Sequence, residues 1–139
     1  MRLVLDTNVL VSAFLWEGPP GRLIALADEQ VITLYTSRVL LDELSVVLQR
    51  GKFTRRVQAT GLSAAQLMRH YQRLAHRISV RQLTQRISRD ADDDQVLACA
   101  LTAQADLIVS GDKHLHGLGG HYSGIPILTP ALAVQQIAR

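Results

Sequence analysis

The sequence has little of what disulfide-bonded, thiolate-metal or membrane proteins need. Its one cysteine, Cys99, can form neither an internal disulfide nor a thiolate metal site, and its alanine- and leucine-rich surroundings favour a small core residue. No apolar run approaches the ~20 residues that cross a bilayer, and the first residues lack the basic and apolar segments of a secretion signal. We therefore expect a cytoplasmic protein that makes no membrane contact.

Negative charge is missing from one long stretch of the chain. Between Leu44 and Arg89 there is no Asp or Glu, whereas ten of the 15 Lys and Arg residues lie there. Such a stretch is typical of a surface that binds a polyanion, although a solvated helical face on a basic protein would have the same composition. The cations that we expect to bind RNA are Arg50, Lys52, Arg55, Arg56, Arg69 and Arg73.

Segments with the apolar periodicity of strands and helices alternate along the chain. We expect strands at 2–6, 31–35, 106–109 and 125–128, helices at 7–15, 22–27, 37–49, 63–74, 92–104 and after Pro130, and a strand or loop at 78–83. Residues 17–20 (EGPP) predict a turn, and Ser63 with Gln66 predicts a capping box. The alternation predicts an α/β fold with a mostly parallel sheet, in a single domain that spans residues 1–139.

Two aspartates follow strands of this predicted sheet. Asp6 closes the first strand and Asp112 follows strand 106–109, so both should lie at the carboxyl edge, where open parallel sheets bind ligands. Each also has a purely structural interpretation, because Asp6 could cap the first helix and Asp112 could be an ordinary turn residue. Glu43 borders the apolar stripe of its helix, where a carboxylate needs a partner unless its head reaches solvent.

Further aspartates, at positions 90 and 92–94, crowd the expected start of helix 92–104. A helix N-terminus favours one or two carboxylates through its dipole and its need for caps, but a larger number repel one another. Asp94 leads the face that carries Leu97, Ala98 and Leu101, so we expect Asp94 to point toward the sheet. Asp93 is the alternative for the same role.

The acids Asp6, Glu43, Asp94 and Asp112 would repel one another in a shared pocket unless protons or a cation neutralised them. Because no paired set of cysteines or histidines accompanies them, the expected ion is Mg²⁺ or Mn²⁺ and not zinc. Two histidines, His114 and His116, follow Asp112 closely, and we expect them to be exposed loop residues.

The successive acidic motifs of the PIN-domain superfamily resemble four segments of this chain, in order LDTNVLVSAFLW, LLDEL, DADDDQVLACAL and LIVSGD. The Gly-Pro-Pro after the first helix and the closing IPILTP resemble a group of toxins from toxin–antitoxin pairs within that family. The resemblance implies a three-layer α/β/α fold, a homodimer, and hydrolysis of RNA phosphodiester bonds with one or two Mg²⁺ or Mn²⁺ ions. VapC-type toxins of this superfamily are held inactive by a cognate antitoxin protein.

Transferred residue by residue, the resemblance implies that Asp6 and Asp94 are the principal metal ligands. Glu43 would be the central helix carboxylate and Asp112 the fourth catalytic acid. Asn8 and Ser110 would hold these ligands in place. The run of aspartates at 92–94 departs from the family pattern, because it offers several candidates for one position.

Three other interpretations stay open. A phosphatase of the haloacid-dehalogenase kind also places an aspartate after its first strand, but it expects a second acid where this chain has Asn8. A catalytically silent PIN-like module would bind RNA or a partner protein, although the presence of all four acids argues against lost activity. A DNA-directed nuclease of the same superfamily would use a similar acidic pocket, but the chain is small for the extra clamps of such enzymes.

Overall fold

The computed structural model describes residues 1–80 and 91–138, in which strands and helices alternate. The strands are β1 (Arg2–Leu5), β2 (Thr33–Thr36), β3 (Ala75–Arg77), β4 (Leu107–Val109), β5 (His121–Tyr122) and β6 (Ile125–Leu128). The helices are α1 (Thr7–Leu15), α2 (Pro19–Asp28), α3 (Arg38–Leu48), α4 (Thr54–Ala59), α5 (Ala64–Leu74), α6 (Ala91–Ala103), α7 (Lys113–His116) and α8 (Pro130–Ile137), with a short 3₁₀ helix, η1 (Gly51–Phe53), before α4.

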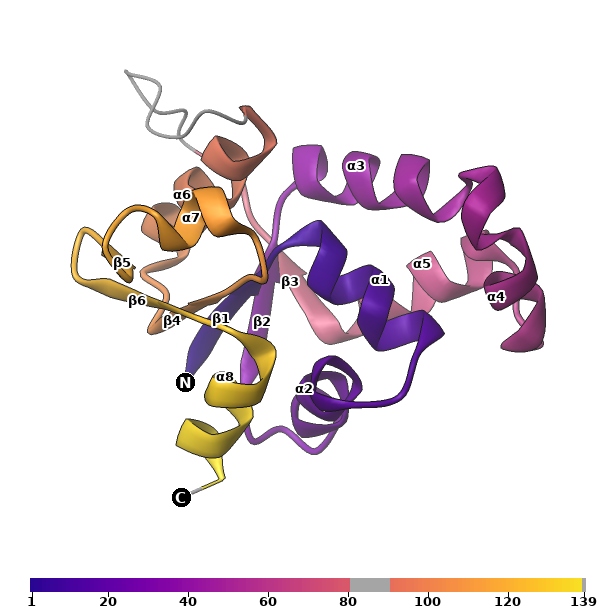
Figure 1. Ribbon diagram of the computed structural model, residues 1–139, viewed down its shortest axis with the longest axis horizontal. Coiled ribbons are helices and arrows are strands. Elements are labelled where there is room, and N and C mark those ends of the chain that lie inside the picture. The colour runs from indigo at the N-terminus through magenta and orange to yellow at the C-terminus, as the bar shows by residue number, and fades with distance from the viewer. Residues whose placement is uncertain (81–90, 139) are drawn as a thin grey trace.

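Strand β1 lies in the middle of the sheet, whose strand order is β3-β2-β1-β4-β6-β5 (Figure 1). Every neighbouring pair is parallel except β5 and β6. Leu5 at the end of β1 pairs with Val109 at the end of β4. The residues that follow these strands, Asp6 and Ser110, therefore meet at the carboxyl edge of the sheet, where such folds bind ligands.

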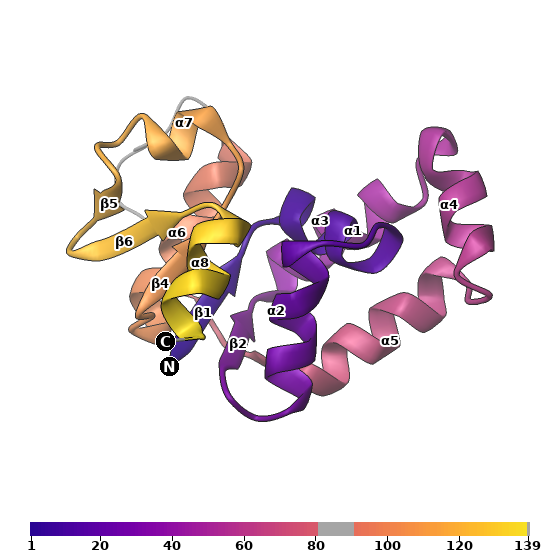
Figure 2. The same ribbon diagram turned by 60° about the horizontal axis from the view of Figure 1, so that its bottom comes forward.

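Side chains along the central strands alternate between two apolar layers. Leu3 and Leu5 of β1 pack with residues of α1, α2, α3, α5 and α8, whereas Val4 packs with residues of α6 and α7. In β4, Ile108 likewise belongs to the layer of α6. Figure 2 shows α2 and α8 on one side of the sheet and α6 on the other. The fold is a three-layer α/β/α arrangement with a mostly parallel sheet, which confirms the expected fold class.

Helix α5 begins at the predicted capping box. The backbone N–H of Gln66 donates to Ser63 Oγ at 3.1 Å, and the backbone N–H of Ser63 donates to Gln66 Oε1 at 2.8 Å. Helix α3 begins in a similar way, because Ser37 Oγ accepts the N–H of Leu40 at 3.3 Å. These bonds satisfy N–H groups that have no partner within the first turn of a helix, and they fix where the helices start.

The turn expected at residues 17–20 separates α1 from α2 but is shorter than predicted, because α2 begins at Pro19 and not at residue 22. Proline has no N–H, and the first N–H groups of a helix have no partner within it, so the two prolines lose nothing there. Gly18 precedes them with a φ of 131°, a conformation that side chains other than hydrogen rarely allow. Residues 16–18 form the turn, and the prolines start the helix.

Of the two alternatives expected at 78–83, the described residues 78–80 form a loop, and the strand lies just before them. Strand β3 covers Ala75–Arg77 and pairs with Leu34–Thr36 of β2, and residues 78–80 have no regular secondary structure. Residues 81–83 lie outside the described part of the chain. Four short elements, η1, α4, α7 and β5, were not expected from the sequence. Within residues 1–80 and 91–138, no helix combines the length and the apolar character that crossing a bilayer requires.

Candidate active site

A small pocket of about 40 Å³ at the carboxyl edge of the sheet is lined by carboxylates from four separate segments. Asp6 comes from the junction of β1 and α1, Glu43 from the middle of α3, Asp93 from the first turn of α6, and Asp112 from the segment after β4. The other lining residues are Thr7, Asn8 and Val96. Three of the four acids expected at the site line this pocket, and Asp93 is the fourth carboxylate in it.

Asp6 has both of the roles that the sequence left open for it. Its side chain is only 5% exposed and caps α1, because Oδ1 accepts the N–H of Val9 at 3.0 Å. Its second oxygen, Oδ2, accepts a hydrogen bond from the hydroxyl of Ser110. The backbone N–H of Asp6 donates to the carbonyl of Val109 at 3.0 Å, so the parallel pairing continues one residue past β1. The cap and the pocket thus use the same carboxylate.

The electrostatic environment of Asp6 favours its neutral form. Burial raises the pKa of Asp6 above its ordinary value, hydrogen bonds from Ser110 and Val9 lower this pKa, and the charge of Asp112 raises it again. The balance is a raised pKa, because loss of hydration is the largest contribution. A cation bound near Asp6 would stabilise its charged form, because it would offset both the lost hydration and the repulsion from Asp112.

Ser110 connects Asp6 to Asp112. It is fully buried, its hydroxyl donates to Asp6, and its Oγ accepts the backbone N–H of Asp112 at 2.9 Å. Its carbonyl oxygen is 2.6 Å from His116 Nε2, so a half-buried histidine in α7 also contacts this segment. His116 is therefore not the exposed loop residue that the sequence suggested, and the side chain of His114 lies outside the described part. No local pattern predicts the His116 contact, because it depends on the short helix α7.

Asp93 and Asp94 differ in their place on α6. Asp93 is 5% exposed and shares a helix face with Val96, Leu97 and Ala100, all of them buried in the core. Asp94 is half-buried and is not among the residues that line the pocket. Leu101, which shares the face of Asp94, is 36% exposed. The structure thus brings the alternative residue, Asp93, to the pocket.

The six cations expected to bind RNA are all exposed, but they do not surround the acidic pocket. Arg50, Lys52, Arg55 and Arg56 lie at η1 and α4, beyond the C-terminal end of α3, where Figure 1 shows the chain farthest from the sheet. Arg69 and Arg73 lie on α5. Arg77, Arg81, Arg86 and Arg89 complete the positive stretch, and the last three lie outside the described part.

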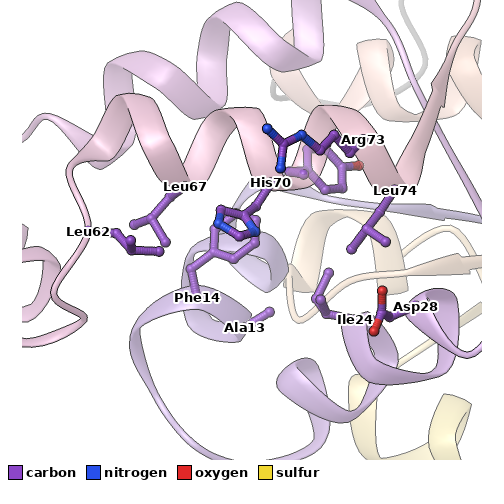
Figure 3. Close-up of a pocket in the computed structure, with 10 residues that line it drawn as sticks. Ala13, Phe14, Ile24, Asp28, Leu62, Leu67, His70, Arg73 and Leu74 are labelled. Atoms are coloured by element: carbon purple, nitrogen blue, oxygen red, sulfur yellow. The ribbon is translucent and has the colours of Figure 1, made fainter.

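A larger cavity of about 500 Å³ is separate from the acidic pocket. Figure 3 shows its apolar walls, which come from α1, α2 and α5, together with Asp28, His70 and Arg73. An adjoining cavity of about 430 Å³ shares Asp28 and Arg73 with it. Among the described residues, Asp28 is the one acid that lines these two cavities, and none of the acids predicted for the site lines either of them.

The donor chemistry of the acidic pocket fits a divalent cation. Four carboxylates supply only oxygen ligands, which Mg²⁺ and Mn²⁺ prefer. Within the described residues, no three His, Cys, Asp or Glu side chains are already close enough together to form a metal-binding group. The four carboxylates therefore line one pocket and repel one another there, but in this conformation they do not form a coordination shell.

Comparison with known proteins identifies one family. The family model described as PIN domain matches residues 2–114 of the chain, which includes all four acids that line the pocket. No curated protein matches the chain in a sequence search.

Proposed function

Since this chain belongs to the PIN-domain family, a superfamily of nucleases, we propose that it is an endoribonuclease that requires Mg²⁺ or Mn²⁺. The observation that carries the proposal is the meeting of Asp6, Glu43, Asp93 and Asp112, from four separate segments, in one pocket. A fold does not by itself need four carboxylates together, because their charges destabilise one another. A cation bound among these carboxylates would offset their repulsion.

The residues that would hold the ion are Asp6, Glu43, Asp93 and Asp112. When bound, such an ion would lower the pKa of a water molecule and offset the negative charge that develops on the phosphate during hydrolysis. The hydrogen bonds of Asp6 with Val9 and Ser110 hold its carboxylate in one orientation. Ser110 also fixes the backbone at Asp112, so one hydroxyl positions two of the acids.

Asp93 replaces Asp94 in this proposal because of where α6 presents the two side chains. The resemblance to PIN domains left several aspartates for one ligand position, and the buried face of α6 favours the residue that shares it with Val96 and Leu97. Asn8 lines the pocket at the start of α1 and would contact the substrate or the ligands there. Thr7, which the sequence analysis did not single out, lines the same pocket and is buried.

The biological role that we propose is that of a toxin in a type II toxin–antitoxin pair, acting on cytoplasmic RNA as a homodimer and held inactive by a cognate antitoxin. The Gly-Pro-Pro segment and the closing IPILTP support this role through their resemblance to that group. Expression of the chain alone should stop bacterial growth, and growth should resume when a cognate antitoxin is expressed with it. Growth unaffected by the active chain would contradict the toxin role and leave the ribonuclease proposal intact.

The test of the proposed activity is hydrolysis of a labelled single-stranded RNA by the purified chain with Mg²⁺, with Mn²⁺ or with EDTA. Asp93→Asn and Asp94→Asn form a matched pair, since each removes one charge from the same turn of α6. We expect metal-dependent cleavage that falls by roughly 100-fold or more in Asp93→Asn and stays near the rate of the unmodified chain in Asp94→Asn. The reverse pattern would return the ligand role to Asp94.

Two further outcomes would change the proposal itself. RNA binding without cleavage under any metal condition would support a silent binding module. Faster cleavage of a DNA strand of the same sequence would support a DNA-directed nuclease. Both comparisons use the same protein preparation and differ only in the substrate or the ion.

A further inference from the structure

Helices α1 and α3 pack against each other and run from the acidic pocket toward α4 (Figure 1, Figure 2). Asp6 caps the first turn of α1, and Trp16 is the residue that ends the same helix. Glu43 lies in the middle of α3, and Arg50 follows its end. Because helices are rigid, the residues that follow the C-terminal ends of α1 and α3 are held at a fixed distance from the pocket.

An aromatic–cation cluster occupies that place, formed by Trp16, Lys52, Phe53 and Arg56. The rings of Trp16 and Phe53 meet edge to face, with 6.1 Å between centroids and 78° between planes. Arg56 Cζ lies 4.9 Å from the centroid of the Trp16 ring, and Lys52 Nζ lies 5.0 Å from that of the Phe53 ring. The cluster thus alternates aromatic surface with positive charge.

The cluster is open to solvent. Trp16 is 40% exposed, although burial of a whole indole ring would stabilise the fold more. Lys52 and Arg56 are exposed, as are their neighbours Arg50 and Arg55. Within residues 1–80 and 91–138, none of these four cations takes part in an ion pair, unlike Arg22 with Glu29 and Arg38 with Asp42. The positive charge of the cluster is therefore available to a negatively charged partner.

We propose that the aromatic–cation cluster binds a single-stranded polynucleotide, with a base stacked on Trp16 or on the Arg56 guanidinium beside it. Aromatic rings that stack on bases, flanked by cations that contact phosphates, are the usual means of holding a single strand without reading its sequence. This inference rests on the proposed function in one respect. It takes the bound strand to be the RNA substrate, part of which reaches the acidic pocket.

The length of α1 sets how much of a strand would bridge the two sites. Its nine residues span about 14 Å at ~1.5 Å per residue. A stacked strand advances ~3.4 Å per nucleotide, so about four nucleotides separate the stacked base from the pocket. A dinucleotide is too short to reach both places, whereas a dodecamer is long enough.

The first test uses Trp16 as its own reporter, because it is the only tryptophan in the chain. Its fluorescence is measured in EDTA, where the proposed cleavage cannot occur, during titration with a uridine dodecamer or with heparin. We expect saturable quenching by the dodecamer, whose bases can stack, and little quenching by heparin, which offers charge without bases. Equal effects of both ligands would show that the cluster recognises charge alone and would overturn the stacking proposal.

The second test measures affinity for the labelled dodecamer in EDTA. Trp16→Ala should weaken binding by roughly 10-fold, whereas Trp16→Phe, which keeps a ring, should weaken it less. Arg56→Ala should weaken binding and reduce the dependence of log affinity on log salt by about one contact. Leu132→Ala is the matched control, because Leu132 is exposed but lies on α8, away from the cluster. Unchanged affinity in Trp16→Ala with unchanged melting temperature would refute the site.

The cleavage reaction separates this inference from the proposed function. With metal present, Trp16→Ala should raise KM for the dodecamer and leave cleavage of a dinucleotide unchanged. Quenching by the dodecamer without any cleavage would retain the cluster and refute the ribonuclease. Cleavage of both substrates at the same rates by Trp16→Ala and the unmodified chain would retain the ribonuclease and refute the cluster. A DNA dodecamer in the same titration tells whether the stacked strand must be RNA.

Discussion

The two roles of Asp6 can be separated by replacing it once with asparagine and once with alanine. Asparagine keeps a side-chain oxygen for the N–H of Val9 and a polar group for the hydroxyl of Ser110, but it carries no charge. Asparagine is also as good a helix cap as aspartate. Alanine removes the charge and both hydrogen bonds. The difference between the two variants therefore isolates the bonds, and the difference between asparagine and aspartate isolates the charge.

The difference in stability between Asp6→Asn and Asp6→Ala can be estimated from the groups that lose a hydrogen-bond partner in the alanine variant. A lost helix cap costs about 1 kcal/mol, and the buried Ser110 hydroxyl without its acceptor costs about another 1 kcal/mol. For a chain of 139 residues, a loss of about 2 kcal/mol in the free energy of unfolding lowers the melting temperature by about 7 °C. We expect Asp6→Ala to melt lower than Asp6→Asn by this amount when both are measured by circular dichroism in EDTA. Equal melting temperatures would refute the assignment of both bonds to Asp6.

The sign of the charge effect follows from the pKa of Asp6. Because burial raises this pKa in the folded state above its value in the unfolded chain, folding favours the protonated carboxyl. The resulting stability is fully present below the unfolded pKa and is lost as the pH rises through the folded pKa. In EDTA, the stability of Asp6→Asn relative to the unmodified chain should therefore increase from pH 4 toward pH 8. A constant difference across this range would show that the charge of Asp6 is not penalised by burial.

The other predictions concern groups around the same fold. Burial raises the pKa of Cys99 to about 12, so a thiol reagent at pH 8 should label it only as fast as the chain unfolds, and rapid labelling of the folded protein would contradict its place in the core. Ser110→Ala should lower the metal-dependent cleavage rate by roughly 10- to 100-fold with the fold retained, and a rate equal to that of the unmodified chain would remove Ser110 from the positioning of the acids. Ser63→Ala should cost about 1 kcal/mol in urea unfolding and Ser63→Thr much less, and equal losses would mean that the capping box contributes nothing.

Local sequence patterns were sufficient to predict where a helix starts when a single capping residue determines that start. Helix α1 starts at Thr7 because Asp6 caps it, and α5 starts where the Ser63 capping box places it, so both could be predicted from neighbouring residues alone. The meeting of Asp6 and Asp112 followed from a rule of topology, that parallel strands present their carboxyl ends at one edge. Neither prediction required knowledge of packing.

The choice between Asp93 and Asp94 could not be made in this way. Adjacent residues on a helix point about 100° apart, so the choice depends on how α6 is rotated against the sheet. Residues 96–100 of α6 are buried on all sides, and a helix that is apolar all round carries no periodic signal for its rotation. Packing against Ile108 and its neighbours decides the orientation, and those contacts join residues far apart in the sequence.

The start of α2 at Pro19 could not be predicted from the sequence for a related reason. The pair Pro19-Pro20 is a strong breaker inside a helix and a favourable start at its first position, and the local sequence is the same in both cases. The short elements α4 and α7 were missed because helices of six and four residues show too few turns for a periodic pattern.

The central position of β1 has a consequence for the synthesis of this chain on the ribosome. Asp6 is made 104 residues before its partner Ser110, and β4 must be in place beside β1 before the two can meet. At ~5–20 residues per second, the ribosome needs about 5 to 21 s to pass from Asp6 to Ser110. During that interval the nascent chain carries Asp6 and Glu43 on unfinished structure, without the assembled pocket. Any partner that had to bind the finished pocket would therefore have to wait until Asp112 had been translated.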